Sequence, residues 1–346
     1  MKQLLLGFFM MLFICTVLAQ ELIKSNWSDT QYPDYITKIT DFGERADWSH
    51  DGKRILFVER SFGDVYEFNL ETKKYKPLTH HYYHGGYVRA HYLSNGDILL
   101  SGVKDFPGDN WKEARFRLAE LWVLDKNLDK PAERLGEYCW EGPAVSRTQL
   151  KIAWAQHHGL FPESRRYYNL WVGELDYSSG KPVIVNQKVV LDNQREGIKG
   201  MVIEPQNFIP GNENELTVQL YNNCEVYGLN LLDGTLVNYS KDPNSYDEPE
   251  GIFPDGKHTL VESSRHTQSN SGANIDLWKL KLDRVKPEWE RITWFNEGGI
   301  YKASNPVVSD DGKYIAFQVT GAKEVAGIGH GIYILDLEKW KKSNRK

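Results

Sequence analysis

The sequence predicts an all-β fold built from repeated units of up to four strands, and two observations lead to this class. A Ser-His-Asp-Gly-Lys phrase at residues 49–53 returns near the C-terminus as Ser-Asp-Asp-Gly-Lys at 309–313. Each copy lies between two short strands, and a third strand follows after a loop. The composition agrees, since 29 glycines and 13% aromatic residues accompany no long stretch of helical periodicity. Repetition of this kind is typical of a ring or array of small sheets.

The first 19 residues are expected to be a signal peptide. Lys2 supplies a positive start, residues 4–18 are almost wholly apolar, and Val-Leu-Ala at 17–19 fits a cleavage site before Gln20. The alternative is an uncleaved anchor, but this run is shorter than the roughly 20 residues of a spanning helix. We therefore expect one domain over residues 20–346, periplasmic or secreted, with no transmembrane segment after cleavage.

Charge and cysteine content narrow the possible partners and the possible covalent cross-links. The chain has 42 basic and 47 acidic residues, and loss of Lys2 with the signal peptide brings the net charge to −6. No basic stripe stands out, which argues against nucleic acid as a partner. Cys139 and Cys224 remain, and a disulfide between them and two separate thiols are both open alternatives. We expect a monomer.

Asx-Gly pairs set the phase of the repeats. They occur at 51–52, 95–96, 255–256 and 311–312, and they suit a tight turn between antiparallel strands because both residues tolerate positive φ. Two further copies have lost the pair but keep their strands. The six units are expected at 47–80, 88–137, 140–192, 203–242, 248–295 and 303–340.

The last unit has only three strands, and residues 36–42 supply the fourth. Their sequence, Ile-Thr-Lys-Ile-Thr-Asp-Phe, resembles the closing strands at 76–79 and 291–294. A blade shared by both chain ends closes the ring and removes its open sheet edges. The prediction is a six-bladed β-propeller with an N-terminal strand closing the last blade. Seven blades, with another unit inside the longer repeats, are less favoured.

The repeat phrases at 47–53 and 308–313, with Ile-Tyr-Ile-Leu-Asp-Leu at 332–337, resemble those of the TolB-like (WD-repeat-like) β-propeller family. The resemblance covers nearly the whole mature chain, most clearly in the first and last units, and implies six blades. The extra α/β domain of TolB itself is lacking, so a Tol-Pal role is not implied. A more distant resemblance is to oligogalacturonate lyases, whose repeats surround a histidine-rich manganese site. Their metal-ligand motif has no residue-by-residue match here.

Propeller geometry sorts the loops by face. Loops between second and third strands, and the connections between blades, emerge opposite the Asx-Gly turns. Four of these loops are long, and eight of the ten histidines lie on or beside this face. Because loops on a rigid ring commonly carry function, the site is expected on this long-loop face. The long loops are 103–119, 156–168, 263–275 and 320–331.

We expect the protein to be a recognition module that binds a ligand or partner, an oligosaccharide or a protein, through the long-loop face. Glu248 and Glu250 begin an innermost strand, so that Glu248 or Glu250 would look into the central channel, and Glu204 is at the corresponding place one blade earlier. A buried carboxylate there needs an arginine, a metal or a ligand. The expected ligand-binding residues are Arg89, Arg165, Arg166, Glu204, Gln206, Glu248, Glu250 and His330.

The alternative function is a carbohydrate-active enzyme, a lyase on uronate-containing oligosaccharides. Such a lyase must neutralise the substrate carboxylate, by arginine or a metal, and needs a histidine or tyrosine base. A divalent metal such as manganese held by His84, His157 and His266 stays open. The candidate catalytic residues are His84, His157, His266, Arg265 and Tyr168.

Overall fold

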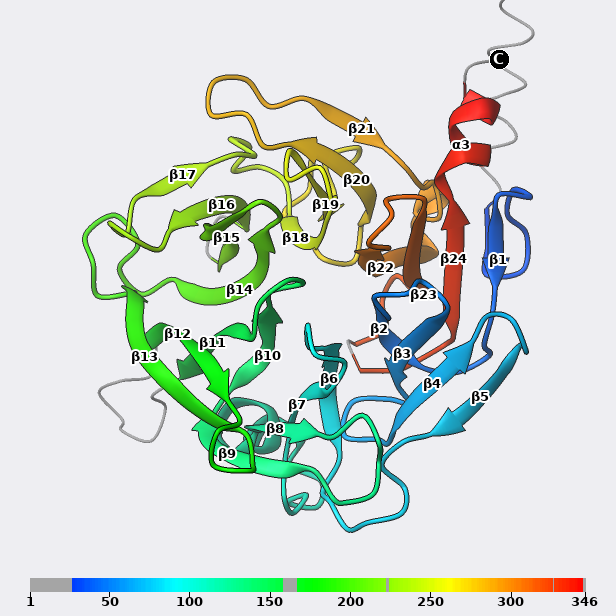
Figure 1. The fold of residues 1–346 in the computed structure, drawn as a ribbon. Coiled ribbons are helices and arrows are strands. Elements are labelled where there is room, and N and C mark those ends of the chain that lie inside the picture. The colour runs from blue at the N-terminus through cyan, green and yellow to red at the C-terminus, as the bar shows by residue number, and fades with distance from the viewer. Residues whose placement is uncertain (1–26, 158–166, 222–223, 326, 345–346) are drawn as a thin grey trace, which may run out of the picture.

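The computed structural model describes residues 27–157, 167–221, 224–325 and 327–344. Six four-stranded antiparallel sheets, here called blades 1 to 6, follow one another around a common axis (Figure 1). The predicted number of blades and the predicted phase of all six units are confirmed. Within each blade the first strand lies innermost and its successors follow outward.

Strand bounds follow the predicted units closely. Blades 1 to 3 consist of β2 (Glu44–Trp48), β3 (Arg54–Val58), β4 (Val65–Asn69) and β5 (Lys74–Pro77); β6 (Tyr87–Tyr92), β7 (Ile98–Gly102), β8 (Glu120–Leu124) and β9 (Glu133–Tyr138); and β10 (Trp140–Val145), β11 (Lys151–His157), β12 (Tyr168–Asp176) and β13 (Val183–Asp192). Blades 4 to 6 consist of β14 (Val202–Ile209), β15 (Asn212–Tyr221), β16 (Glu225–Asn230) and β17 (Leu236–Asn238); β18 (Asp247–Ile252), β19 (His258–Ser263), β20 (Asp276–Lys281) and β21 (Trp289–Arg291); and β22 (Tyr301–Val308), β23 (Tyr314–Gly321), β24 (Ile332–Asp336) and β1 (Ile36–Lys38).

Helical segments are short and peripheral to the sheets. A single turn, α2 (Trp111–Glu113), continues into a π-helical turn η1 (Ala114–Leu118) inside the loop between β7 and β8. A 3-10 turn η3 (Glu297–Gly299) precedes blade 6, and α3 (Leu337–Asn344) follows β24. None of the helices in the described ranges is long and apolar enough to cross a membrane.

The ring closes through the predicted N-terminal strand. β1 pairs antiparallel with β24, with Ile36 opposite Leu335 and Lys38 opposite Tyr333, so the blue and red ends of the chain lie side by side in Figure 1. The regular strand is shorter than predicted, but Ile39 N still donates to Ile332 O at 2.8 Å. The two ends of the chain therefore share blade 6.

The core is a set of hydrophobic clusters, one at each of the six junctions between neighbouring blades. At the junction of blades 6 and 1, for example, Trp48 and Phe57 pack with Ala316 and Ile332. Burial of apolar area between the blades stabilises the ring. The axis itself is left to polar side chains.

The repeated Asp-Gly-Lys phrase is a structural turn. Asp51 Oδ1 accepts hydrogen bonds from Ser49 Oγ at 2.6 Å and Lys53 N at 3.0 Å, and Asp311 accepts the same pair in blade 6. The following Gly52 has a φ of 67°, which glycine adopts without steric cost. These turns define the face opposite the long loops, here called the turn face.

No disulfide joins Cys139 to Cys224. Cys139 is 1% exposed and belongs to the hydrophobic cluster between blades 2 and 3. Burial in this cluster raises the pKa of the Cys139 thiol well above its usual range. Of the two alternatives left by the sequence, the structure has separate thiols.

Candidate functional site

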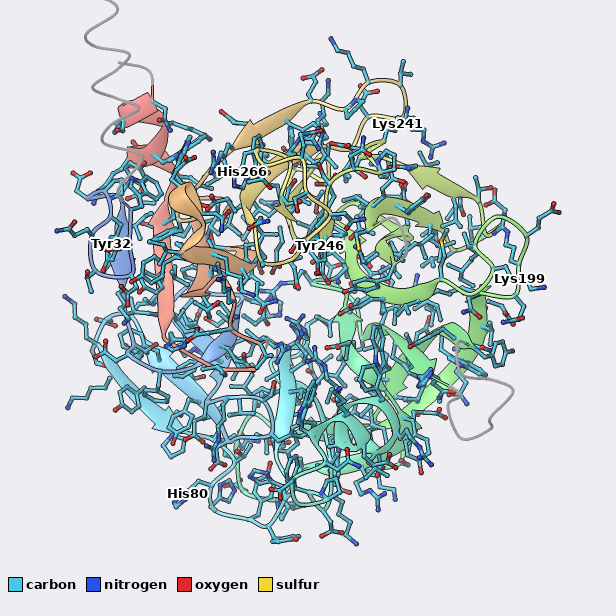
Figure 2. The ribbon with its side chains drawn as sticks, turned by 180° about the vertical axis from the view of Figure 1, so that it is seen from behind. Tyr32, His80, Lys199, Lys241, Tyr246 and His266 are labelled. Carbon is cyan, nitrogen blue, oxygen red and sulfur yellow. The ribbon has the colours of Figure 1, made fainter. Side chains whose placement is uncertain are left out.

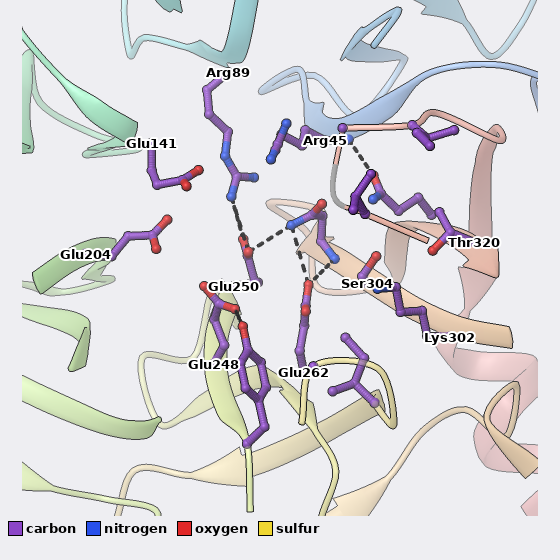
Figure 3. Close-up of a pocket in the computed structure, with 18 of the residues that line it drawn as sticks. Arg45, Arg89, Glu141, Glu204, Glu248, Glu250, Glu262, Lys302, Ser304 and Thr320 are labelled. Carbon is purple, nitrogen blue, oxygen red and sulfur yellow. Dashed lines mark hydrogen bonds and ion pairs between the residues drawn. The ribbon is translucent and has the colours of Figure 1, made fainter. Parts of the chain in front are cut away.

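A cavity of about 260 Å³, here called the central cavity, lies on the axis at the long-loop face (Figure 3). Innermost strands of all six blades contribute to its wall, and the loops 263–275 and 320–331 contribute to its rim. Most of the wall is ionisable or hydrogen-bonding. The charged residues and tyrosines that line it are Arg45, Arg89, Arg115, Glu141, Glu204, Tyr221, Tyr246, Glu248, Glu250, Glu262 and Lys302.

Bulges in the innermost strands aim these side chains. Each of the six strands has a break in its pairing register at a similar level, and a bulge re-aims side chains next to many functional sites. In three of the strands the bulged residue is a non-glycine with positive φ: Arg45 (53°), Glu141 (61°) and Asn305 (46°). Such backbone conformations cost free energy and are typical of functional sites.

A shared tyrosine joins two carboxyl groups of the acidic wall. Tyr221 Oη lies 2.8 Å from Glu204 Oε2 and 2.6 Å from Glu248 Oε1. One phenol carries one proton and can donate to only one of these oxygens. The second contact therefore requires a protonated carboxyl that donates to the phenol oxygen. Tyr246 Oη donates to the other oxygen of Glu248.

Burial explains why a proton stays on this wall. Burial, reinforced by neighbouring Glu248 and Glu141, raises the pKa of Glu204 well above its usual range. Burial and the nearby Glu250 raise the pKa of Glu248 to about 7, and the same two causes raise the pKa of Glu262. Carboxyls held partly neutral at physiological pH can donate as well as accept hydrogen bonds.

Arg89 is the central cation of the cavity. Its Nη2 atom lies 3.2 Å from Glu250 Oε1, and the two side chains are 11% and 6% exposed. Asn305 Nδ2 donates to the same Glu250 oxygen at 2.8 Å, while the backbone N–H of Asn305 donates to Glu262. Blades 2, 5 and 6 are thus linked through one hydrogen-bonded chain across the axis.

A second buried ion pair comes from a long loop. Arg115, on the π-helical turn η1, pairs with Glu141 of β10. Burial opposes ionisation of Glu141, but Arg115 and Arg45 outweigh it, so the pKa of this carboxyl is lowered. Glu141 is therefore the firmly ionised acid of the cavity, in contrast to Glu204.

The opposite wall is rich in donors. Lys302 Nζ donates to the backbone oxygen of Glu324 at 3.2 Å and forms no ion pair within the described ranges. Arg45 Nε and Thr320 Oγ1 have no hydrogen-bond partner among the described residues, although these residues are only 4% and 6% exposed. Lys302 and Thr320 are cross-strand partners on β22 and β23. Figure 3 shows Arg45, Lys302 and Thr320 across the pocket from Glu141, Glu204 and Glu248.

Two further cavities continue along the axis toward the turn face. The first, of about 60 Å³, is lined by His91 and Gln206 among others. The second, of about 370 Å³, contains Arg147, which pairs with Asp310 at 2.8 Å and Asp47 at 3.3 Å. Because the cation of this larger cavity is already matched by carboxylates, the central cavity is the better candidate for a ligand site.

The predicted ligand-binding residues divide into four groups. Arg89, Glu204, Glu248 and Glu250 line the central cavity, whereas Gln206 lines the small cavity below it. His330 lies on the β23–β24 loop, where it pairs with Glu324 at 2.8 Å. Arg165 and Arg166 fall outside the described residues. Whether the four cavity residues bind a ligand stays a prediction.

The candidate catalytic residues are not brought together at the central cavity. His84 pairs with Asp64 at 3.0 Å, and His266 lies 3.2 Å from Asn296 Oδ1. Figure 2 shows His266 farther from the axis than Tyr246. The other three pack locally as well: His157 stacks on Tyr168 with ring centroids 4.6 Å apart, and Arg265 lies over the Trp289 ring and pairs with Asp242 and Asp247.

A metal bound by these histidines does not fit the described residues. In that part of the chain no group of three or more His, Cys, Asp or Glu side chains is arranged to hold a metal ion. His84, His157 and His266 each contact a different local neighbour. The central carboxylates are interspersed with arginines and tyrosines.

Most of the residues that line the cavity were not predicted from the sequence, yet a signal was present. Four innermost strands contain a proline one or two positions after a polar residue that lines the cavity: Glu141, Glu204, Glu248 and Asn305. Proline cannot donate to a strand ladder and is confined to edges and bulges. A polar residue followed by proline in an innermost strand therefore marks the bulge. This pattern would have added Glu141 and Asn305 to the predicted site residues.

The raised pKa of Glu248 gives a testable pH dependence. The folded protein retains a proton that the unfolded chain releases, so the stabilising contribution of Glu248 is complete below about pH 4.5 and is lost as the pH rises through about 7. Burial lowers the pKa of His91 to about 4 and gives an opposite trend, so a variant comparison is needed. We expect Glu248→Gln to gain stability relative to wild type between about pH 5 and about pH 7.5.

Urea unfolding of both proteins at the two pH values measures this difference. Because His91 is present in both, its contribution cancels to first order. If the difference in unfolding free energy between Glu248→Gln and wild type is the same at both pH values, Glu248 titrates at its ordinary pKa.

Comparisons with known proteins support the fold. No protein-family model matches the chain, and no curated protein resembles it in sequence. Among solved structures, the gluconolactonase XC5397 from Xanthomonas campestris has a TM-score of 0.54 at 14% identity, with 87% of this chain and 88% of that chain covered. A TolB-type protein from Agrobacterium tumefaciens has 0.51 at 12%, with 79% and 97% covered. An oligogalacturonate lyase in complex with manganese has 0.50 at 11%, with 87% and 92% covered.

These identities are low, so the comparisons establish the fold alone. The chain has the six-bladed propeller architecture found in TolB-type proteins and oligogalacturonate lyases. The resemblance noted in the sequence is confirmed at this level.

Proposed function

We propose that this protein is a recognition module that binds a small polar ligand in the central cavity of its long-loop face. One observation carries the proposal: buried and half-buried ionisable side chains converge from all six blades on one cavity. Burying charge costs free energy, and apolar packing is often at least as stabilising as a buried ion pair. Perturbed ionisable groups gathered in a cleft favour a functional site over a purely structural one.

The lining favours a small ligand with several hydrogen-bonding groups. The wall offers carboxylate acceptors, guanidinium and ammonium donors, and phenols that do both. A volume of about 260 Å³ is slightly below the roughly 300–1,000 Å³ of common ligand pockets. A compact molecule, or one terminal group of a larger partner, fits these properties. The apolar segment at residues 4–18 supports action after export, in the periplasm or outside the cell.

A ligand panel with two matched lysine variants tests the proposal. Thermal unfolding is followed with monosaccharides, disaccharides, sugar acids and amino acids. We expect at least one compound to raise the Tm, because a ligand that binds only the folded state stabilises it. Lys302→Met is expected to remove this shift, whereas Lys323→Met, an exposed lysine on the neighbouring loop, is expected to retain it. A shift that survives Lys302→Met would place the binding site elsewhere.

A lyase acting on uronates is the second candidate, and one observation favours it. Lys302, which could face a substrate carboxylate, lines the same cavity as the phenols Tyr221 and Tyr246. A tyrosine can exchange a proton with the substrate in an elimination. Incubation with uronate oligosaccharides, with and without manganese, distinguishes the two functions. Unsaturated product that is lost on Tyr246→Phe would overturn the binding-only proposal.

A further inference from the structure

We infer that the ligand of the central cavity is dipolar, with a carboxylate against Arg45, Lys302 and Thr320 and an ammonium group at Glu204 and Glu248. This inference rests on the proposed function and names the ligand class for the same site. The simplest such ligands are amino acids. It is carried by the contrast between two walls that line one cavity (Figure 3).

The donor wall is only partly satisfied: Arg45 Nη1 pairs with Glu44 Oε1 at 2.8 Å, but other polar groups of this wall are left over. Arg45 Nε and Thr320 Oγ1 are without a hydrogen-bond partner among the described residues, and each belongs to a residue more than nine-tenths buried. Within the described ranges, Lys302 Nζ makes one hydrogen bond, to the backbone oxygen of Glu324 at 3.2 Å. Buried donors without acceptors are rare in proteins, and each calls for an explanation. A ligand carboxylate offers two oxygens and the negative charge that the lysine lacks.

Two carboxyl groups of the acidic wall form no ion pair in the described ranges, although the charge of Arg89 acts on both. Arg89 faces Glu250, and Arg115 faces Glu141, which leaves Glu204 and Glu248 with no arginine of their own in the described ranges. These two are joined instead through Tyr221, at 2.8 and 2.6 Å, by an arrangement that needs a retained proton. An ammonium group has three donors and a full positive charge. It can therefore satisfy both carboxylates and release the proton that held them together.

Ligands with a single charge match only half of the cavity. An anion without an ammonium group leaves the Glu204–Glu248 pair dependent on its proton, and an amine without a carboxylate leaves the donor wall unsatisfied. Arg45 in blade 1 and Glu204 in blade 4 are directly opposite in the six-blade order, whereas Lys302 of blade 6 and Glu248 of blade 5 come from neighbouring blades. A ligand with charges at its two ends spans this arrangement.

Isothermal titration with matched compounds tests the inference. The probes are L-amino acids and the ω-amino acids from glycine to 6-aminohexanoate, each beside the carboxylic acid that lacks the amine and the amine that lacks the carboxylate. We expect at least one amino acid to bind at least about tenfold more tightly than both counterparts. Binding in phosphate and in Tris is expected to show proton release to the buffer. Retained affinity in Lys323→Met is the control.

Two substitutions assign the ends of the ligand. Lys302→Met is expected to lower affinity to that of the amine counterpart, and Glu204→Gln to that of the acid counterpart. If Glu204→Gln fails to fold, Lys302→Met still tests the carboxylate end, and the wild-type proton release tests the other. Acid or amine counterparts that bind as tightly as the amino acid would overturn the dipolar class. Stabilisation by sugars alone would also overturn the dipolar class but would leave the proposed function intact. If no compound in either panel binds, both the dipolar class and the proposed function are overturned.

Discussion

Replacing Arg89 with methionine is expected to lower the free energy of unfolding by about 3–5 kcal/mol, because removal of one partner of a buried ion pair leaves an uncompensated charge. Arg89 and Glu250 are 11% and 6% exposed and lie 3.2 Å apart. Glu204 and Glu141 are also close enough to raise the pKa of Arg89 further. Urea unfolding of Arg89→Met and wild type at neutral pH measures the loss.

Arg134→Met is the matched control for this substitution. Arg134 makes two hydrogen bonds to Glu120, at 3.0 and 2.6 Å, but its side chain is 49% exposed. Exposed pairs contribute about 0–1 kcal/mol. Equal losses in the two variants would contradict the account, because Arg89 would then behave as a surface arginine and not as the counter-charge of the central cavity.

Substitution of Ile36 by aspartate is expected to lower the free energy of unfolding by at least about 3 kcal/mol. Ile36 is 3% exposed, belongs to the cluster between blades 5 and 6, and pairs with Leu335 across the ring closure. The change removes a buried apolar side chain and places a carboxylate there. Detachment of β1 would also leave the edge of β24 without its partner, so we expect aggregation on heating.

Thr37→Asp introduces the same charge into the same strand. Thr37 is exposed and points away from the core, so the expected change is within about 0.5 kcal/mol. Thermal and urea unfolding of the two variants are compared directly. A small loss in Ile36→Asp would show that β1 is dispensable and that the ring is closed by the remaining blade contacts.

The fold was accessible from the sequence because local chemistry specifies its parts. The Asp-Gly turns fix where hairpins reverse, and Asp51 and Asp311 make the same side-chain hydrogen bonds in blades 1 and 6. The closing strand was found because residues 36–42 repeat the pattern of other outer strands. Its regular part ends at Lys38, since beyond that point single hydrogen bonds to blade 6 replace the ladder.

The site was only partly accessible. Glu204, Glu248 and Glu250 were placed on the axis because acidic residues at the start of innermost strands have few other places to point. Lys302 and Thr320 were missed because their importance depends on which groups lack partners, and that is decided by distances across blades. The histidines pointed to the face that carries the central cavity but did not locate the cavity, because His84 and His266 contact Asp64 and Asn296 and do not line it.

The packing between the blades and the charged central cavity are connected. Six hydrophobic junctions hold the blades together, so the axis can carry charges that would be costly in a single central core. Bulges at one level of the innermost strands then turn these charges toward one cavity. The junctions between blades therefore stabilise the ring, and the charged side chains gather at the central cavity.

A crystal structure of the protein with the compound that raises its Tm most tests the central claim directly. We expect ligand density in the central cavity, between Glu248 and Lys302, with a ligand carboxylate near Thr320. Density confined to the cavity around Arg147, or to the outer surface of the loops, would contradict it.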